Sequence, residues 1–86
     1  MVDKFDTLGL TTRSGKYYLW NDLSSIEYFM AKKRFTAERK VHSLHFYFKE
    51  GKASAGYLMP NIIQLIKKAN ELQVPKREKM VGYYIK

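Results

Sequence analysis

The chain has 86 residues and no cysteine. A chain of this length has room for one hydrophobic core and no second domain. Hydrophobic residues make up 45% of the sequence and aromatic residues 15%, which is enough apolar surface to offset the entropy of ordering the chain. We therefore expect a single folded domain over residues 1–86. The lack of cysteine excludes disulfides, thiolate metal sites and cysteine nucleophiles.

The charge balance is strongly basic. Sixteen lysines and arginines against eight acidic residues give a net charge of +8. A positive surface favours acidic partners, and anionic lipid, acidic protein and nucleic acid all meet that requirement, while a role in solubility alone is the alternative. The N-terminal residues are charged, and the uncharged stretch 53–66 is too short and too polar to cross a bilayer. We therefore expect a cytoplasmic protein, either free or at the inner face of the membrane.

Two strand-forming runs open the chain. Residues 8–12 and 17–20 flank a Ser14-Gly15 turn, which predicts a hairpin. A cluster of turn-forming residues follows at 21–25, and residues 26–30 alternate well enough to form a strand. This alternation predicts a third strand.

The clearest strand pattern lies in residues 41–49. One predicted face holds His42, Leu44, Phe46 and Phe48, and the other holds Ser43, His45, Tyr47 and Lys49. This period of two is typical of a half-buried strand. Glu50-Gly51-Lys52 is a turn signal, and residues 53–59 then alternate again. A fourth and a fifth strand are therefore expected as a second hairpin.

A helix is expected after these strands. Pro60 suits the first turn of a helix, and apolar residues follow at spacings of three and four, namely Ile62, Leu65, Ile66, Ala69 and Leu72. Pro75 ends the helix, and residues 80–85 are either a short last strand or an aromatic tail on the sheet. The predicted class is α+β, with an antiparallel sheet of about five strands in hairpins and one C-terminal amphipathic helix.

The stretch Tyr18-Leu19-Trp20-Asn21-Asp22-Leu23-Ser24-Ser25-Ile26 resembles a signature of bacterial pleckstrin-homology-like domains. In that family a Trp-x-Asp-aliphatic-x-x-aliphatic stretch closes one strand and enters the next. The resemblance implies a curved sheet capped by a helix, a non-enzymatic binding role, and a place on the cytoplasmic side of membrane proteins. The predicted strands are fewer than in a full pleckstrin-like barrel, so the expected form is a truncated or half-closed barrel.

A basic segment, residues 32–40, joins the third and fourth predicted strands and holds five cations, one anion and one aromatic residue. At an anionic membrane each basic residue contributes about 1 kcal/mol, and a phenylalanine adds insertion among the headgroups. The alternative is a solvated hairpin loop that protects the sheet from edge pairing. The candidate contacts with a ligand or membrane are Lys32, Lys33, Arg34, Phe35, Arg39 and Lys40.

Nucleic acid is the alternative partner. The candidate contacts are Lys67, Lys68, Lys76, Arg77 and Lys79, with Tyr17, Tyr47, Tyr83 and Tyr84 as stacking platforms. Tyrosines at strand spacing are also common as cross-strand pairs, which is the structural alternative. Self-association through an exposed strand or through residues 80–85 is a third hypothesis.

No catalytic constellation is predicted. His42 and His45 lie three positions apart on a predicted strand and therefore point to opposite faces, which excludes a shared metal ion. The sequence has no defensible carboxylate pair, no nucleophile motif and no glycine-rich phosphate loop. We therefore expect neither enzymatic activity nor a cofactor, metal or small-molecule substrate, and we expect Trp20 in the core between sheet and helix.

Overall fold

The N-terminal part of the chain forms a small antiparallel sheet. The computed structural model describes residues 1–33 and 38–84. Its first three strands pair in the order β1-β2-β3 and are β1 (Val2–Phe5), β2 (Gly9–Thr12) and β3 (Tyr17–Leu19). Asp6 fixes the β1–β2 turn, because its Oδ1 accepts backbone N–H bonds from Leu8 at 2.9 Å and Gly9 at 3.0 Å. An aspartate that bonds to the backbone in this way is typical of a tight turn.

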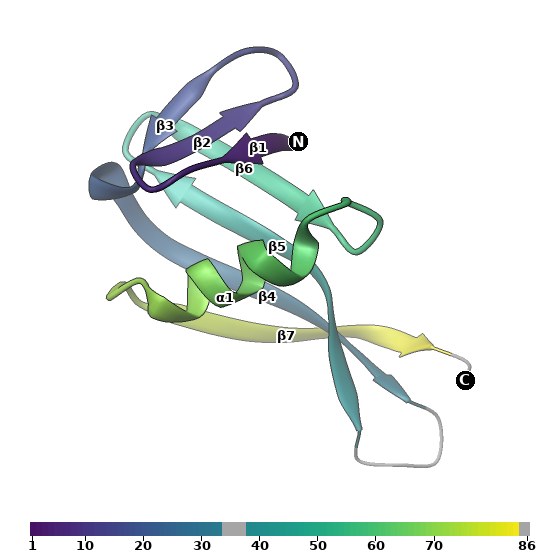
Figure 1. Cartoon of the computed structure of the whole chain (residues 1–86). Helices are drawn as coiled ribbons and strands as arrows, with labels where there is room; N and C mark the ends of the chain where they lie inside the picture. Colours follow the sequence, from purple (N-terminus) through teal and green to yellow (C-terminus); the bar gives the residue numbers. More distant parts are fainter. Residues whose placement is uncertain (34–37, 85–86) are drawn as a thin grey trace.

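A larger sheet follows after a short 3-10 helix. The remaining elements in chain order are the 3-10 helix η1 (Trp20–Asp22), the strands β4 (Leu23–Lys33), β5 (Arg39–Phe48) and β6 (Gly51–Gly56), the helix α1 (Ile62–Glu71) and the strand β7 (Lys76–Tyr84). The four strands lie in the order β6-β5-β4-β7, and β7 runs parallel to β4 while the other two pairings are antiparallel. A parallel pairing needs a long connection, and α1 supplies it as the chain returns from β6 to the far side of β4 (Figure 1).

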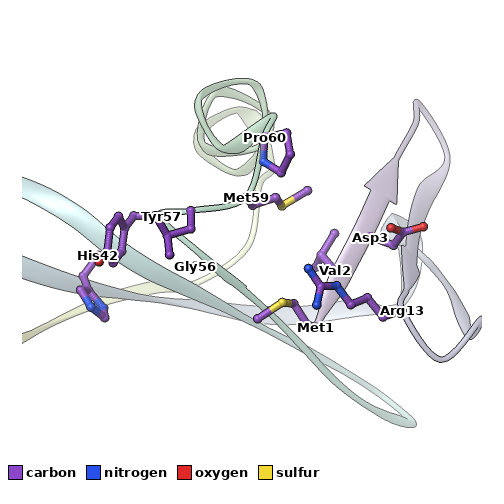
Figure 2. Close-up of a pocket in the computed structure, with 10 residues that line it drawn as sticks. Met1, Val2, Asp3, Arg13, His42, Gly56, Tyr57, Met59 and Pro60 are labelled. Atoms are coloured by element: carbon purple, nitrogen blue, oxygen red, sulfur yellow. The ribbon is translucent and has the colours of Figure 1, made fainter.

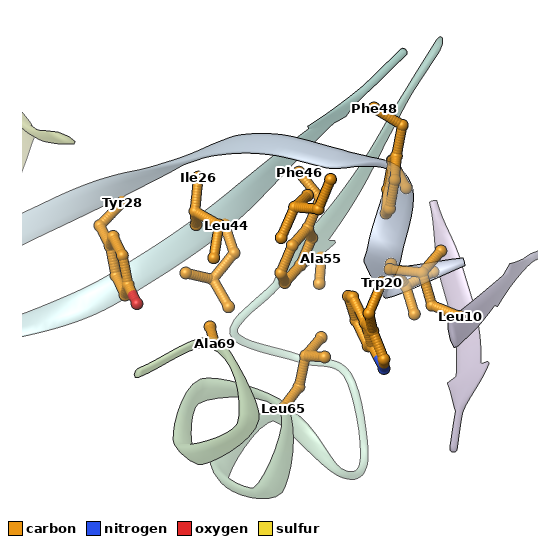
Figure 3. Close-up of a cluster of buried hydrophobic side chains, with 13 residues drawn as sticks. Leu10, Trp20, Ile26, Tyr28, Leu44, Phe46, Phe48, Ala55, Leu65 and Ala69 are labelled. Carbon is orange, nitrogen blue, oxygen red and sulfur yellow. The ribbon is translucent and has the colours of Figure 1, made fainter. Parts of the chain in front are cut away.

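The core lies on one face of the larger sheet, where α1 and the N-terminal sheet pack against it. Figure 3 shows Leu65 and Ala69 of α1 facing the sheet, with Trp20 and Leu10 beside them on the same side. Leu65, Ala69 and Leu10 are 0% exposed, and the Trp20 ring lies 5.6 Å from that of Phe46. Burying a leucine or phenylalanine side chain contributes about 1.5–3 kcal/mol. The core therefore holds α1 and the N-terminal sheet on the same face.

The structure confirms the α+β class and the amphipathic helix near the C-terminus. The expected strand number was wrong, because the described chain has seven strands in two sheets instead of about five in one. The two sheets do not close into a barrel. Among the residues that the structure describes, no helix has the length and apolar character needed to span a membrane.

The two additional strands, β1 and β7, have no clear strand pattern in the sequence. β1 is short and includes Asp3 and Lys4, so its pattern does not stand out in the sequence. β7 begins with Lys76 and its first half is almost entirely charged. Charged residues are usual on strands at a sheet edge, where they discourage pairing with another chain. β7 is such an edge strand, and the prediction therefore recognised only its end.

Several predicted boundaries also shift. β6 ends at Gly56 instead of residue 59, and α1 begins at Ile62 instead of Pro60. The register of β4 and β5 changes between Phe29 and Met30, which leaves His42 as an extra residue on β5. His42 is exposed, so the predicted apolar face of this strand begins at Leu44.

Candidate functional site

The face of the larger sheet opposite α1, called the open face below, is the main candidate site. Both α1 and the N-terminal sheet lie on the other side (Figures 1 and 3), so no element within residues 1–33 and 38–84 covers it. Successive side chains of a strand alternate between faces, and residues paired across strands share a face. The open face consists of Ser25, Glu27 and Phe29 on β4, Ser43, His45 and Tyr47 on β5, Lys52 and Ser54 on β6, and Arg77 and Lys79 on β7.

Three aromatic rings form a row on the open face. The rings of Phe29 and His45 lie 4.5 Å apart between centroids, and those of His45 and Tyr47 lie 6.3 Å apart. All three side chains are half-buried by their neighbours in the sheet and lie on the uncovered side. The Tyr47 hydroxyl donates a hydrogen bond to Glu27 Oε1 at 2.9 Å, which fixes the end of the row. The row spans the two central strands of the sheet.

Cations flank this row on both edges of the sheet. On β7, Arg77 is in register with Glu27 and Lys79 with Phe29, while on β6 Lys52 is in register with Tyr47. Three cations and a single carboxylate therefore lie on this face, and that carboxylate already accepts the tyrosine hydroxyl. The open face is positive on balance, in agreement with the net charge of the chain.

The electrostatics of the row agree with this arrangement. Partial burial lowers the pKa of His45, the charge of Lys52 lowers it further, and Glu27 opposes both. The hydrogen bond to Glu27 and partial desolvation raise the pKa of Tyr47, whereas Arg77 acts in the opposite direction. His45 is therefore mainly a neutral ring at neutral pH, suited to stacking, and Tyr47 is protonated.

The basic segment 32–40 joins β4 to β5 in the sequence, and its residues 34–37 lie outside the described residues. Arg34 and Phe35 lie outside the described part, and Lys33 ends β4. In the described part, Lys32 is in register with Arg39 and Ala31 with Lys40. Arg39 forms an ion pair with Glu78 of β7, at 3.0 Å between Nη1 and Oε1. This pair partly offsets the positive charge of the segment.

The five residues proposed for nucleic acid do not share one surface. Arg77 and Lys79 lie on the open face, whereas Lys67 and Lys68 lie on α1, on the other side of the sheet. Lys76 reaches back to the end of α1, where its Nζ donates to the backbone carbonyl of Leu72. A cation bonded to the last carbonyls of a helix stabilises that helix end. The sequence grouping therefore divides into two separate surfaces and one helix cap.

The proposed tyrosine platforms also separate. Tyr47 lies in the aromatic row, while Tyr17 lies on β3 and donates to Asp6 Oδ1 at 3.1 Å. The side chains of Tyr83 and Tyr84 lie outside the described part of the structure.

Trp20 lies in the core at 7% exposure, as predicted, and its indole N–H donates to the Asp6 carbonyl oxygen at 2.9 Å.

The sequence pattern alone indicates no binding role for two members of the row, Phe29 and His45. It predicts a strand at Phe29, and at His45 it offers only the metal-ligand role that the spacing from His42 excludes. The signal was present, because Glu27 and Phe29 alternate with buried residues on β4 as His45 and Tyr47 do on β5.

Comparisons with protein-family models, with curated proteins and with solved structures found no match.

Proposed function

We propose that this protein is a non-catalytic module that binds single-stranded nucleic acid on the open face. The observation that supports the proposal is the row formed by Phe29, His45 and Tyr47, with Arg77 and Lys52 on opposite sides of it. Aromatic rings on an uncovered sheet are a common means of stacking unpaired bases, and flanking cations attract the phosphate backbone. Both ingredients occur here on one surface.

The magnitudes are sufficient for useful affinity. Stacking of one base on an aromatic side chain contributes about 1–3 kcal/mol by alanine substitution. Each phosphate contact releases condensed counterions, so binding to a single strand weakens with salt by about 0.7 logarithmic units per contact. Stacking has little preference among the bases, because each base presents an aromatic face. We therefore expect binding with weak sequence preference and a steep dependence on salt.

A single strand suits the row better than a duplex. The bases of a duplex are stacked on one another, so their faces are not accessible to protein rings. The three rings of the row supply stacking surfaces only to unpaired bases. A duplex would engage the cations of the open face alone, and its affinity would be lower.

The pleckstrin-like, membrane-proximal role stays a prediction. It depends on the stretch from Trp20 to Ile26 and on the basic segment 32–40, part of which lies outside the described residues. Cosedimentation with vesicles, prepared with and without anionic lipid, tests it separately. Binding that requires anionic lipid supports that role, and equal sedimentation with both kinds of vesicle removes it.

The test of the proposal compares two double variants with the same loss of charge. Arg77→Gln/Lys79→Gln removes two cations from the open face, and Lys67→Gln/Lys68→Gln removes two from α1. Fluorescence anisotropy with a labelled oligouridylate and with oligothymidylate, repeated over a series of salt concentrations, gives affinity and salt slope. We expect the first variant to lower the magnitude of the slope by about 1.4, that is, about 0.7 for each lost contact.

The helix variant is the matched control, and its slope should equal that of the unmodified protein. Equal losses in the two variants would show that binding follows net charge and not the open face. Absence of binding to any single strand at low salt would end the proposal. Binding of a duplex as tightly as a single strand would remove the stacking part of it.

A second variant tests stacking without changing charge. Phe29→Leu keeps an apolar side chain of similar volume and removes the ring that lies 4.5 Å from His45. We expect a loss of about tenfold in single-strand affinity, which corresponds to the lower part of the stacking range. The salt slope should not change, because no phosphate contact is lost. An unchanged affinity would contradict the stacking role of the row.

A further inference from the structure

A second candidate site lies away from the open face, in a cavity beside the N-terminal sheet. The cavity has a volume of about 450 Å³ and lies between β1, the β2–β3 turn and the segment that joins β6 to α1. Figure 2 shows its walls, with Val2 on one side and Met59 and Pro60 on the other. Pockets that bind small molecules usually measure about 300–1,000 Å³ and are mainly apolar with a few polar groups. This cavity has that size.

The rim of the cavity leaves large apolar side chains in water. Met1, Tyr57 and Leu58 line it and are 56%, 52% and 81% exposed. Exposed apolar side chains that gather at one place often mark a binding site, whereas single ones need no explanation. These three lie around one opening. The apolar part of a ligand would cover surface that the folded chain leaves exposed.

One cation faces this apolar surface. The Arg13 side chain extends from the β2–β3 turn toward Val2 and Met1 (Figure 2). The backbone of Arg13 is held beside β1, because its N–H donates to the carbonyl oxygen of Met1 at 2.8 Å. Among the described residues, its guanidinium has no ion pair or side-chain hydrogen bond. A guanidinium presents a rigid set of donors that matches a carboxylate or a phosphate.

We propose that this cavity binds a small amphipathic anion, with an apolar body against Met59 and Val2 and a single carboxylate or phosphate group paired with Arg13. The net charge of +8 favours an anion, and the carboxylate of Asp3, which also lines the cavity, disfavours a ligand with a second anionic group. The site is separate from the open face, so its ligand and a nucleic acid occupy different surfaces. This inference does not rest on the proposed function.

The test uses octanoate, octyl phosphate and octanol as probes, which share one chain and differ in the head group. Amide chemical shifts in ¹H–¹⁵N spectra locate the binding and give its affinity. We expect saturable shifts at Val2, Tyr57 and Met59 with octanoate or octyl phosphate, and the better of the two identifies the head group. Octanol should bind at least about tenfold more weakly, because it lacks the charge that pairs with Arg13.

Arg13→Gln is the decisive variant. The fold depends on the backbone of this residue and its side chain is exposed, so the variant should fold. We expect it to lose about tenfold in affinity for the anionic probes and to keep its affinity for octanol. Lys52→Gln removes the same charge from the open face and should leave all three affinities unchanged. Equal binding of octanoate by Arg13→Gln and by the unmodified protein, or shifts confined to the open face, would overturn the proposal.

Discussion

Leu65→Ala on α1 tests how the layers of the fold are arranged. Leu65 is 0% exposed between the helix and the larger sheet, whereas Ile63, two positions earlier on the same helix, is 64% exposed. The substitution removes three buried carbons at about 0.8 kcal/mol each, or about 2.4 kcal/mol. The cavity that remains raises the cost to about 3–4 kcal/mol. A domain of this size has a total stability of only about 4–13 kcal/mol.

Urea unfolding followed by the fluorescence of Trp20 measures this cost. The indole lies in the same core as Leu65, so its emission reports loss of the packing between sheet and helix. The control is Ile63→Ala, for which we expect a change within about 0.5 kcal/mol, because the side chain is already largely in water. Similar costs for the two variants, or a larger cost at Ile63, would show that Leu65 is not the residue that packs α1 on the sheet. The helix would then present a different side to the sheet.

Other predictions concern single contacts. Gly9→Ala places a Cβ 2.1 Å from a backbone carbonyl oxygen of β3 and should lower the free energy of unfolding in urea by more than about 2 kcal/mol. At the control position, Gly56→Ala, the added Cβ meets nothing within 4 Å, and the change should stay within about 0.5 kcal/mol. Equal costs for the two variants would contradict this prediction. Tyr28→Phe removes the 2.8 Å hydrogen bond from its hydroxyl to Asn70 Oδ1 and should cost about 1 kcal/mol in the same assay, and no loss would show that this bond contributes nothing. Partial burial lowers the pKa of His45 below 6.5, so the unfolded chain binds the proton more readily than the folded one. The stability that His45 contributes is complete above pH 6.5 and is lost as the pH falls through the lower pKa of the folded state. In the His45→Gln variant, the free energy of unfolding in urea should not show this loss at acidic pH. The same pH dependence of stability in both proteins would contradict the lowered pKa of His45.

The core of the fold could be predicted from the sequence because its signals are local. The alternation of Leu44, Phe46 and Phe48 gives one apolar side of β5, and the spacing of Leu65 and Ala69 gives the apolar stripe of α1. Both patterns follow from the geometry of a single element. The helix and the hairpin of β5 and β6 are accordingly predicted with boundaries that are close to those observed.

The edges of the fold could not be predicted in this way. β7 begins with a run of charges, and its place beside β4 depends on the crossover through α1, which brings Lys76 into register with Ile26. Pairing between residues so far apart in the sequence has no local pattern. The charged residues of β7 are suited to a sheet edge, where a strand does not need the apolar alternation by which strands are recognised.

The candidate site depends on the same long-range register. Phe29 and His45 become neighbours only when β4 and β5 pair as they do, and Arg77 joins them only through β7. A list of cations and tyrosines therefore included Lys67, on the wrong side of the sheet, and omitted Phe29. The charge of the site was predictable from composition, but its position was not.

Binding of single-stranded nucleic acid to the open face can be measured by titrating the protein with an oligothymidylate and following the aromatic side-chain resonances. We expect the largest shifts at the rings of Phe29, His45 and Tyr47, and little change at Trp20 in the core. Shifts centred on α1 or on the N-terminal sheet, with the three rings unaffected, would contradict it.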